Sequence, residues 1–126
     1  DPKSYTFLFE SNAEVGYTRP KASVFMEEQA NGYLDLTLKM EGTQAGEEYV
    51  VRVYPGNQTQ WDTVALYQWP NTLAGDTTLE AVLTLDKPFD VVREMEGLFV
   101  VHDPNKPLQL TNDSSFMIKA LFGKDQ

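Results

Sequence analysis

The sequence predicts an all-β fold, in which seven or eight antiparallel strands form two sheets that pack as a sandwich. The first observation is strict alternation of apolar and polar residues over 34–40, which is the pattern of a half-buried strand. The second is a hairpin signal, Asn31-Gly32, directly before that run. The third is the regular spacing of similar runs along the 126 residues, which is typical of sandwiches and barrels.

Eight runs have the composition and alternation of strands. In chain order they span residues 4–10, 22–27, 33–40, 49–54, 63–68, 77–85, 98–102 and 115–122. Two short helical turns are predicted between them. The first covers residues 11–17, where Ser11 can act as the N-cap and Glu14 follows three residues later. The second covers residues 91–95.

The same alternation predicts which side chains face the interior. In the last run, the even-numbered apolar residues from Phe116 to Phe122 fall together on one face. Eight side chains of the predicted strands are expected to be largely buried. They are Leu34, Leu36, Leu38, Leu79, Leu83, Val100, Ile118 and Phe122.

Length and charge limit the organisation and the partners. A chain of 126 residues suits a single domain over residues 1–126. Ten basic residues are scattered among nineteen acids, for a net charge of −9, so we expect neither nucleic acid nor an anionic membrane surface as a partner. No apolar run approaches the ~20 residues of a membrane helix, so direct membrane insertion is not expected. Because the sequence begins at Asp1, we expect a piece of a longer protein.

No residue pattern predicts an enzyme or a metal site. The absence of cysteine excludes disulfides, thiolate ligands and cysteine nucleophiles. His102 is the only histidine, whereas a zinc site needs three or four ligands. We expect His102 to end a strand and to bond to the backbone, although counting residues leaves a Ser-His-Asp arrangement open. The adjacent acids Glu27 and Glu28 point to opposite faces of a strand, so they are unsuited to paired acid–base catalysis.

Two tryptophans flank the predicted strand over 63–68. Trp61 and Trp69 are expected to pack in the core or at a sheet edge. The alternative is an aromatic binding surface at the rim of the sandwich. Two segments, residues 57–59 and 112–114, match the acceptor pattern for N-glycosylation.

A series of segments along nearly the whole chain resembles the NEAT (near-iron-transporter) family. The resemblance consists of a Tyr and a Pro before a strand, a turn followed by a Y-x-x-x-T-L strand, and three later strand and turn patterns. The segments are residues 17–24 (YTRPKASV), 31–38 (NGYLDLTL), 76–80 (DTTLE), 85–89 (LDKPF), 98–104 (LFVVHDP) and 115–122 (SFMIKALF).

The resemblance implies an immunoglobulin-like sandwich on the surface of a Gram-positive bacterium, and hence an extracellular location. NEAT domains bind haem or host haemoproteins in iron acquisition. In the haem-binding members a Y-x-x-x-Y motif in the last hairpin supplies a tyrosinate to the iron, and a short helix near the start forms a lip. Here Asn112 and Phe116 stand where those tyrosines would be.

The implied site therefore lacks the tyrosinate ligand. It consists of a lip and a hairpin, with the following residues: Ser11, Val15, Tyr17, Leu108, Leu110, Asn112 and Phe116. We expect haem, the one cofactor that the resemblance suggests, to bind weakly or not at all through iron. Met26 or His102 would be the other donors to the iron.

Two classes of function follow. The first is a NEAT-like module that binds a host haemoprotein or haem. The alternative is a β-sandwich adhesion or assembly module that binds another protein or a carbohydrate. Neither class is an enzyme.

Overall fold

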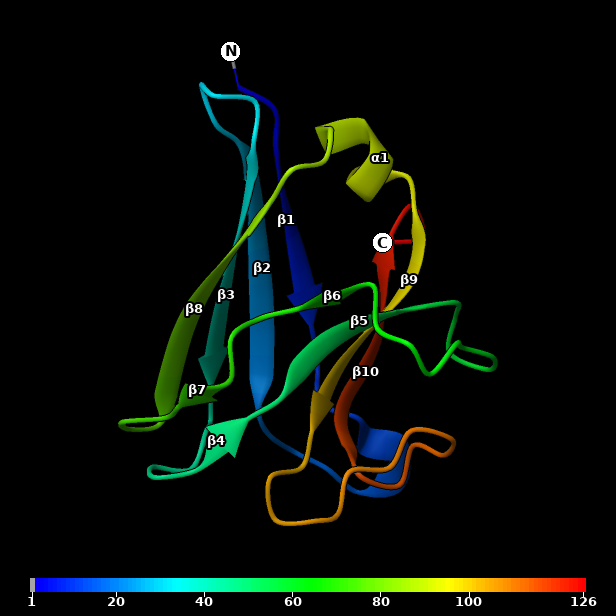
Figure 1. Cartoon of the computed structure of the whole chain (residues 1–126). Coiled ribbons are helices and arrows are strands. Elements are labelled where there is room, and N and C mark those ends of the chain that lie inside the picture. The colour runs from blue at the N-terminus through cyan, green and yellow to red at the C-terminus, as the bar shows by residue number, and fades with distance from the viewer. Residues whose placement is uncertain (1) are drawn as a thin grey trace.

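The computed structural model describes residues 2–126 as two four-stranded antiparallel sheets with short additional elements (Figure 1). The first sheet has the strand order β1-β2-β3-β8 and the second has the order β10-β9-β5-β6. The strands are β1 (Ser4–Phe9), β2 (Lys21–Glu28), β3 (Leu34–Glu41), β4 (Glu48–Tyr49), β5 (Val51–Pro55), β6 (Tyr67–Gln68), β7 (Thr72–Leu73), β8 (Thr78–Leu85), β9 (Glu96–His102) and β10 (Phe116–Gly123). The helical segments are η1 (Ala13–Val15) and α1 (Phe89–Arg93).

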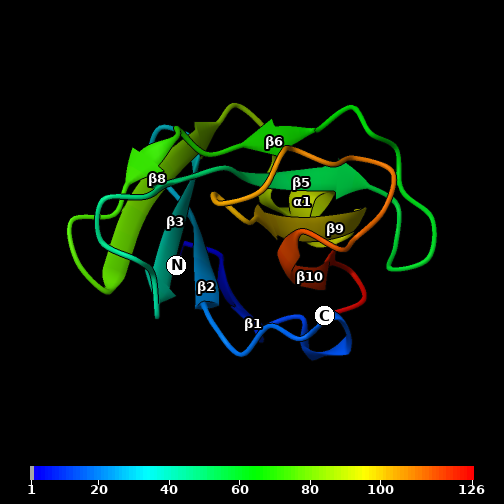
Figure 2. The ribbon, with the colours of Figure 1, turned by 90° about the horizontal axis from the view of Figure 1, so that it is seen from below.

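The prediction of an all-β antiparallel sandwich is confirmed. Figure 2 shows the first sheet as a curved layer with β5, β9 and β10 of the second sheet opposite it. The first three strands are consecutive neighbours in one sheet. In an immunoglobulin constant domain, the second strand instead lies between the first and the fifth. The structure therefore agrees with the immunoglobulin pattern in having two packed sheets and differs from it in strand order.

Aromatic side chains from both sheets fill the space between them. The rings of Phe9 and Phe99 stack with centroids 3.9 Å apart, and Phe7 packs on Phe122 at 4.4 Å. Trp69 is buried here, and its Nε1 donates to the Leu36 carbonyl at 2.9 Å. The prediction that Trp69 packs in the core is therefore confirmed.

Seven of the eight side chains predicted to be buried are buried. The prediction is wrong for Leu83, which is half-buried. Leu83 lies on β8, the edge strand of the first sheet, where the inward side chains from Ala81 to Leu85 are all half-buried and only Leu79 is buried. Val100 is buried on the other face of its sheet, away from the space between the sheets.

A second apolar cluster lies on the outer face of the second sheet. Its buried members are Tyr54, Leu98, Val100 and Phe116. The prediction that Phe116 shares a face with Ile118 is wrong. The register of β10 against β9 shifts between these two residues, and such a bulge reverses the side on which the next side chains point. Phe116 therefore joins the outer cluster, while Ile118 stays between the sheets.

Three other local predictions differ from the structure. The predicted strand over 63–68 is only β6, because the Asp62 carboxylate accepts from the Val64 N–H and fixes a turn there. The run over 49–54 is divided at Val50 into β4 and β5. Ser11 caps no helix: its hydroxyl donates to the Pro20 carbonyl, and η1 begins after Asn12 instead.

The two sides of the sandwich end in different ways. On one side, Gln126 bridges β1 and β10, because its side chain accepts from the Leu8 N–H at 2.7 Å and donates to the Leu121 carbonyl at 3.0 Å. On the other side lie β8 and the two-residue β6. Among residues 2–126, neither helical segment has the length and hydropathy needed to cross a bilayer.

Candidate functional site

Two long loops cover the outer face of the second sheet. We call them the Trp61 loop (residues 56–66) and the Leu110 loop (residues 103–115). In Figure 2 the Trp61 loop lies on the side of the second sheet that is away from the first, and the Leu110 loop crosses in front of β5 and β9 toward it. Gly56 starts the Trp61 loop with a φ of +123°, and a Cβ there would collide with the Gln60 carbonyl and the Trp61 backbone. The tight entry to this loop therefore requires glycine.

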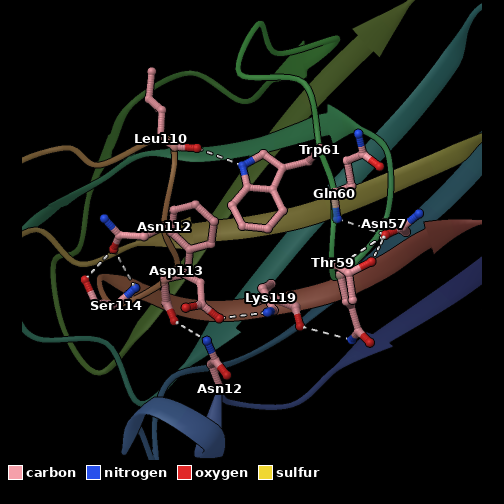
Figure 3. Close-up of polar contacts among 12 residues, drawn as sticks. Asn12, Asn57, Thr59, Gln60, Trp61, Leu110, Asn112, Asp113, Ser114 and Lys119 are labelled. Atoms are coloured by element: carbon pink, nitrogen blue, oxygen red, sulfur yellow. Dashed lines mark hydrogen bonds and ion pairs between the residues drawn. The ribbon is translucent and has the colours of Figure 1, made fainter.

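Trp61 joins the two loops. Its Nε1 donates to the Leu110 carbonyl at 2.7 Å, and its ring packs against Phe116 with centroids 5.6 Å apart (Figure 3). The Lys119 ammonium lies 5.9 Å from the indole centroid. Trp61 is thus half-buried, with its ring on the outer cluster and its N–H on the neighbouring loop.

Polar side chains hold each loop in its own shape. The Asn57 Oδ1 accepts from the backbone N–H groups of Thr59 and Gln60. The Asn112 Oδ1 accepts in the same way from the Ser114 N–H and hydroxyl. Both are turns of the Asx type, and they coincide with the two glycosylation-type segments. The loops are therefore ordered by local hydrogen bonds as well as by the apolar cluster.

An ion pair is partly sheltered beside the indole. The Lys119 Nζ lies 2.7 Å from the Asp113 Oδ2 (Figure 3). These side chains are 11% and 26% exposed, against about half or more for the other ion pairs. A pair shielded from water is more strongly coupled than an exposed one. This ion pair holds the end of the Leu110 loop to β10.

The predicted lip is bonded directly to the predicted hairpin. The Asn12 N–H donates to the Met117 carbonyl at 2.8 Å, and its side-chain amide donates to the Phe116 carbonyl at 3.1 Å. The Tyr17 hydroxyl donates to the Asp103 carboxylate at 2.7 Å. Burial raises the pKa of Tyr17, and the bond to Asp103 raises it further. Tyr17 therefore keeps its proton and is engaged within the protein.

The structure brings the predicted site residues to one end of the second sheet, but in different environments. Leu108, Asn112 and Val15 are exposed, whereas Ser11, Tyr17 and Leu110 are half-buried. Phe116 is fully buried beneath Trp61. Of the other donors considered for iron, Met26 is buried between the sheets, on the opposite side of the second sheet from this cluster.

His102 belongs to a buried polar chain under the loops. Its Nε2 lies 2.7 Å from the Tyr54 hydroxyl, which accepts from the Arg52 guanidinium at 3.1 Å. The side chain therefore bonds to Tyr54, and the predicted bond to the backbone is wrong for it. Because Arg52 donates to the Tyr54 oxygen, the hydroxyl proton is left for Nε2.

Burial lowers the pKa of His102 to about 4, and the nearby Arg52 charge contributes to the shift. The imidazole is thus neutral near pH 7. Its Nδ1 is buried without a hydrogen-bond partner in the described structure, as is the Ser115 hydroxyl. Within residues 2–126, no group of three or more His, Asp or Glu side chains is arranged to hold a metal ion.

Both loops carry exposed apolar side chains. Val64 and Leu66 of the Trp61 loop are 73% and 51% exposed, and Leu108 of the Leu110 loop is 49% exposed. Val64 and Leu66 are not among the predicted site residues, because they alternate within a run that predicts a strand. The signal that was present is Asp62, which is a turn-forming residue two positions before Val64.

Within residues 2–126, no loops of this kind cover the outer face of the first sheet. One end of it is hollowed by about 570 Å³, with Leu8, Lys39 and Glu80 in the lining. The side chains of this outer face alternate along each strand with those that face the core, and the regular register aligns them from strand to strand.

The structure thus has exposed apolar side chains on two loops that Trp61 joins, and a neutral, buried histidine beside Phe116 on the same face of the sheet. Comparison of the chain with models of protein families, with curated protein sequences and with solved structures gives no match, so no family membership is assigned.

Proposed function

We propose that the chain is a non-catalytic binding module that takes a protein partner on the surface formed by the Trp61 and Leu110 loops. The observation that carries the proposal is the exposure of Val64, Leu66 and Leu108 on loops whose backbones are fixed by hydrogen bonds. Apolar groups that are held rigidly in water lose little entropy when a partner covers them. Clustered exposed apolar groups are a mark of protein interfaces.

The resemblance to NEAT domains suggests a haemoprotein as the partner class. The contacts favour a protein over free haem. A porphyrin between lip and hairpin would have to break the bonds of Asn12 and Tyr17 to that hairpin, or displace Trp61 from Phe116. Buried hydrogen bonds left without partners cost about 1–3 kcal/mol each. Cell-surface location stays a prediction from the same resemblance.

Carbohydrate is the second candidate ligand. Polar side chains lie around the indole of Trp61, namely Asn57, Asn112, Asp113 and Lys119 (Figure 3). An aromatic ring with a few convergent polar groups is a general feature of small-ligand sites.

The test is a calorimetric titration with haemoglobin, with parallel titrations of haemin and of mixed oligosaccharides. We expect heat of binding with haemoglobin and no change in the haemin Soret band. Leu108→Ser combined with Val64→Ser should weaken haemoglobin binding by tenfold or more, since each buried aliphatic side chain contributes about 1.5–3 kcal/mol. Val91→Ser, at an exposed residue of α1, is the matched control.

The outcomes separate the candidates. Saturable haemin binding with a Soret shift would contradict the preference for a protein. Quenching of Trp61 fluorescence by an oligosaccharide, absent in Trp61→Phe, would favour carbohydrate. Absence of any haemoglobin binding would remove the haemoprotein as partner.

A further inference from the structure

β8 is an eight-residue strand with one open edge. It pairs with β3 over its whole length. Within residues 2–126, the backbone of residues 79–85 makes no hydrogen bond outside that pairing. In Figure 1 the strand lies at the margin of the first sheet. Open edges of this kind are templates for pairing with another strand.

The open backbone groups can be assigned to individual residues. Directly before β8, the Thr77 carbonyl accepts from the Gly42 N–H at 2.8 Å, on the side of β3. Residues that bond to a given neighbour alternate along an antiparallel ladder. The N–H and C=O groups that face away from β3 are therefore those of Thr78, Glu80, Val82 and Thr84.

β8 lacks most of the usual features that prevent edge pairing, although it carries one charge, Glu80, and β7 lies near it. Proteins protect edges with lysine, proline, bulges or short length, whereas β8 reads TLEAVLTL and pairs regularly with β3. The other edges are protected. β6 has two residues, and Gln126 bonds to both β1 and β10.

We propose that β8 pairs with β8 of a second copy of this chain, antiparallel about a two-fold axis at Val82, so that the two first sheets become continuous. In this register Leu79 faces Leu85 and Ala81 faces Leu83 on the inner side. On the outer side Val82 faces its own copy and Glu80 faces Thr84. The half-buried Ala81, Leu83 and Leu85 would gain cover.

Charge selects this register. Glu80 is the one ionisable residue of β8. An axis at Glu80 would place it against itself, and an axis at Leu83 would place it against Asp86. Like charges directly opposite each other are destabilising. An axis at Ala81 would face Glu80 with the apolar Val82. The strand is therefore complementary to itself in the Val82 register.

The experiment measures mass and exchange as a function of concentration. Sedimentation velocity of the whole chain from about 10 μM to about 1 mM should show a monomer–dimer equilibrium with a Kd of about 1 mM or tighter. Amide hydrogen exchange should slow with concentration at Glu80, Val82 and Thr84. Because each copy carries a net charge of −9, added salt should favour the dimer.

Three substitutions test the edge and its register. Val82→Lys places two lysines face to face and should abolish dimerisation. Phe25→Lys is the matched control, because Phe25 lies in the same cross-strand row of the outer face but on the inner strand β2. Thr84→Lys should tighten the dimer about 2- to 30-fold through two new pairs with Glu80.

A chain that stays monomeric at about 1 mM, with exchange independent of concentration, overturns the proposal. Equal loss in Phe25→Lys would locate the contact on the sheet face instead of the edge, which also overturns it. A weaker dimer in Thr84→Lys would contradict the Val82 register. β8 lies on the opposite sheet from the Trp61 and Leu110 loops, so the partner titration above stands or falls separately.

Discussion

The outer faces of the two sheets differ in how they are covered. The outer face of the second sheet is covered by the Trp61 and Leu110 loops, which lie over a buried apolar cluster around Phe116. The outer face of the first sheet is bare, and Leu8 there is 71% exposed. Within the covered sheet, β9 is apolar on both faces over Leu98–Val101, whereas β3 of the bare sheet alternates. On that side of the molecule the two loops therefore form a third layer above the two sheets.

The largest test of this difference is truncation of one phenylalanine on each outer face. Phe116→Ala should destabilise the protein by about 3–5 kcal/mol, because it leaves a cavity in the covered cluster. Phe25→Ala, on the bare face, should cost less than about 1 kcal/mol. Urea unfolding of both variants measures the two values. Equal costs would show that the loops do not exclude water from Phe116.

The second test uses pH. The pKa of His102 is lowered to about 4 in the folded protein, from 6.5 in the unfolded chain. The unfolded state therefore binds more protons between these values, and stability falls as the pH is lowered from 6.5 towards 4. The loss should be at most about 3 kcal/mol.

Denaturant midpoints at pH 7 and pH 4 measure that loss. His102→Gln, which cannot titrate, should show a shallower decline over the same window. Because carboxylates also titrate near pH 4, only the difference between the two proteins reports on His102. A variant with the same pH profile as the natural sequence would show that the imidazole is not isolated from water.

The smallest effect is expected from the bond between the loops. Trp61→Phe keeps the aromatic packing on Phe116 but removes the hydrogen bond to the Leu110 carbonyl. It should cost about 1 kcal/mol and speed amide exchange in the Leu110 loop. Leu8→Ala on the bare face should change stability by less than about 0.5 kcal/mol. Unchanged exchange in Trp61→Phe would mean that the cluster alone holds the loop.

The sequence predicted the elements whose signal is local. Alternation in β3, and glycine turns such as Asn31-Gly32, identify the strands of the bare sheet, because one of its faces meets water. In β9 every side chain from Gly97 to His102 is buried, so no alternation marks the two faces. The sequence of β9 therefore does not indicate which of its faces the two loops cover.

The candidate site was less predictable because it depends on contacts between distant segments. Nothing near Phe116 in the sequence indicates the bulge that turns its ring outward under Trp61. His102 was expected to bond to the backbone, yet its partner, Tyr54, is 48 residues away. The sequence predicts Leu108 and Leu110 for the site, whereas its alternation predicts a strand at Val64.

The hydrogen bonds by which Gln126 links β1 to β10 have a consequence for how the chain folds. The bonds of Gln126 to Tyr5 and Leu8 span 121 and 118 residues, and the bond of Asn12 to Phe116 spans 104. Contacts that enclose such long stretches form only after the loop-closure entropy has been met, and they are associated with slow folding. The last step of folding should therefore be the docking of β1 and the lip onto β10, with hairpins such as β2–β3 forming first.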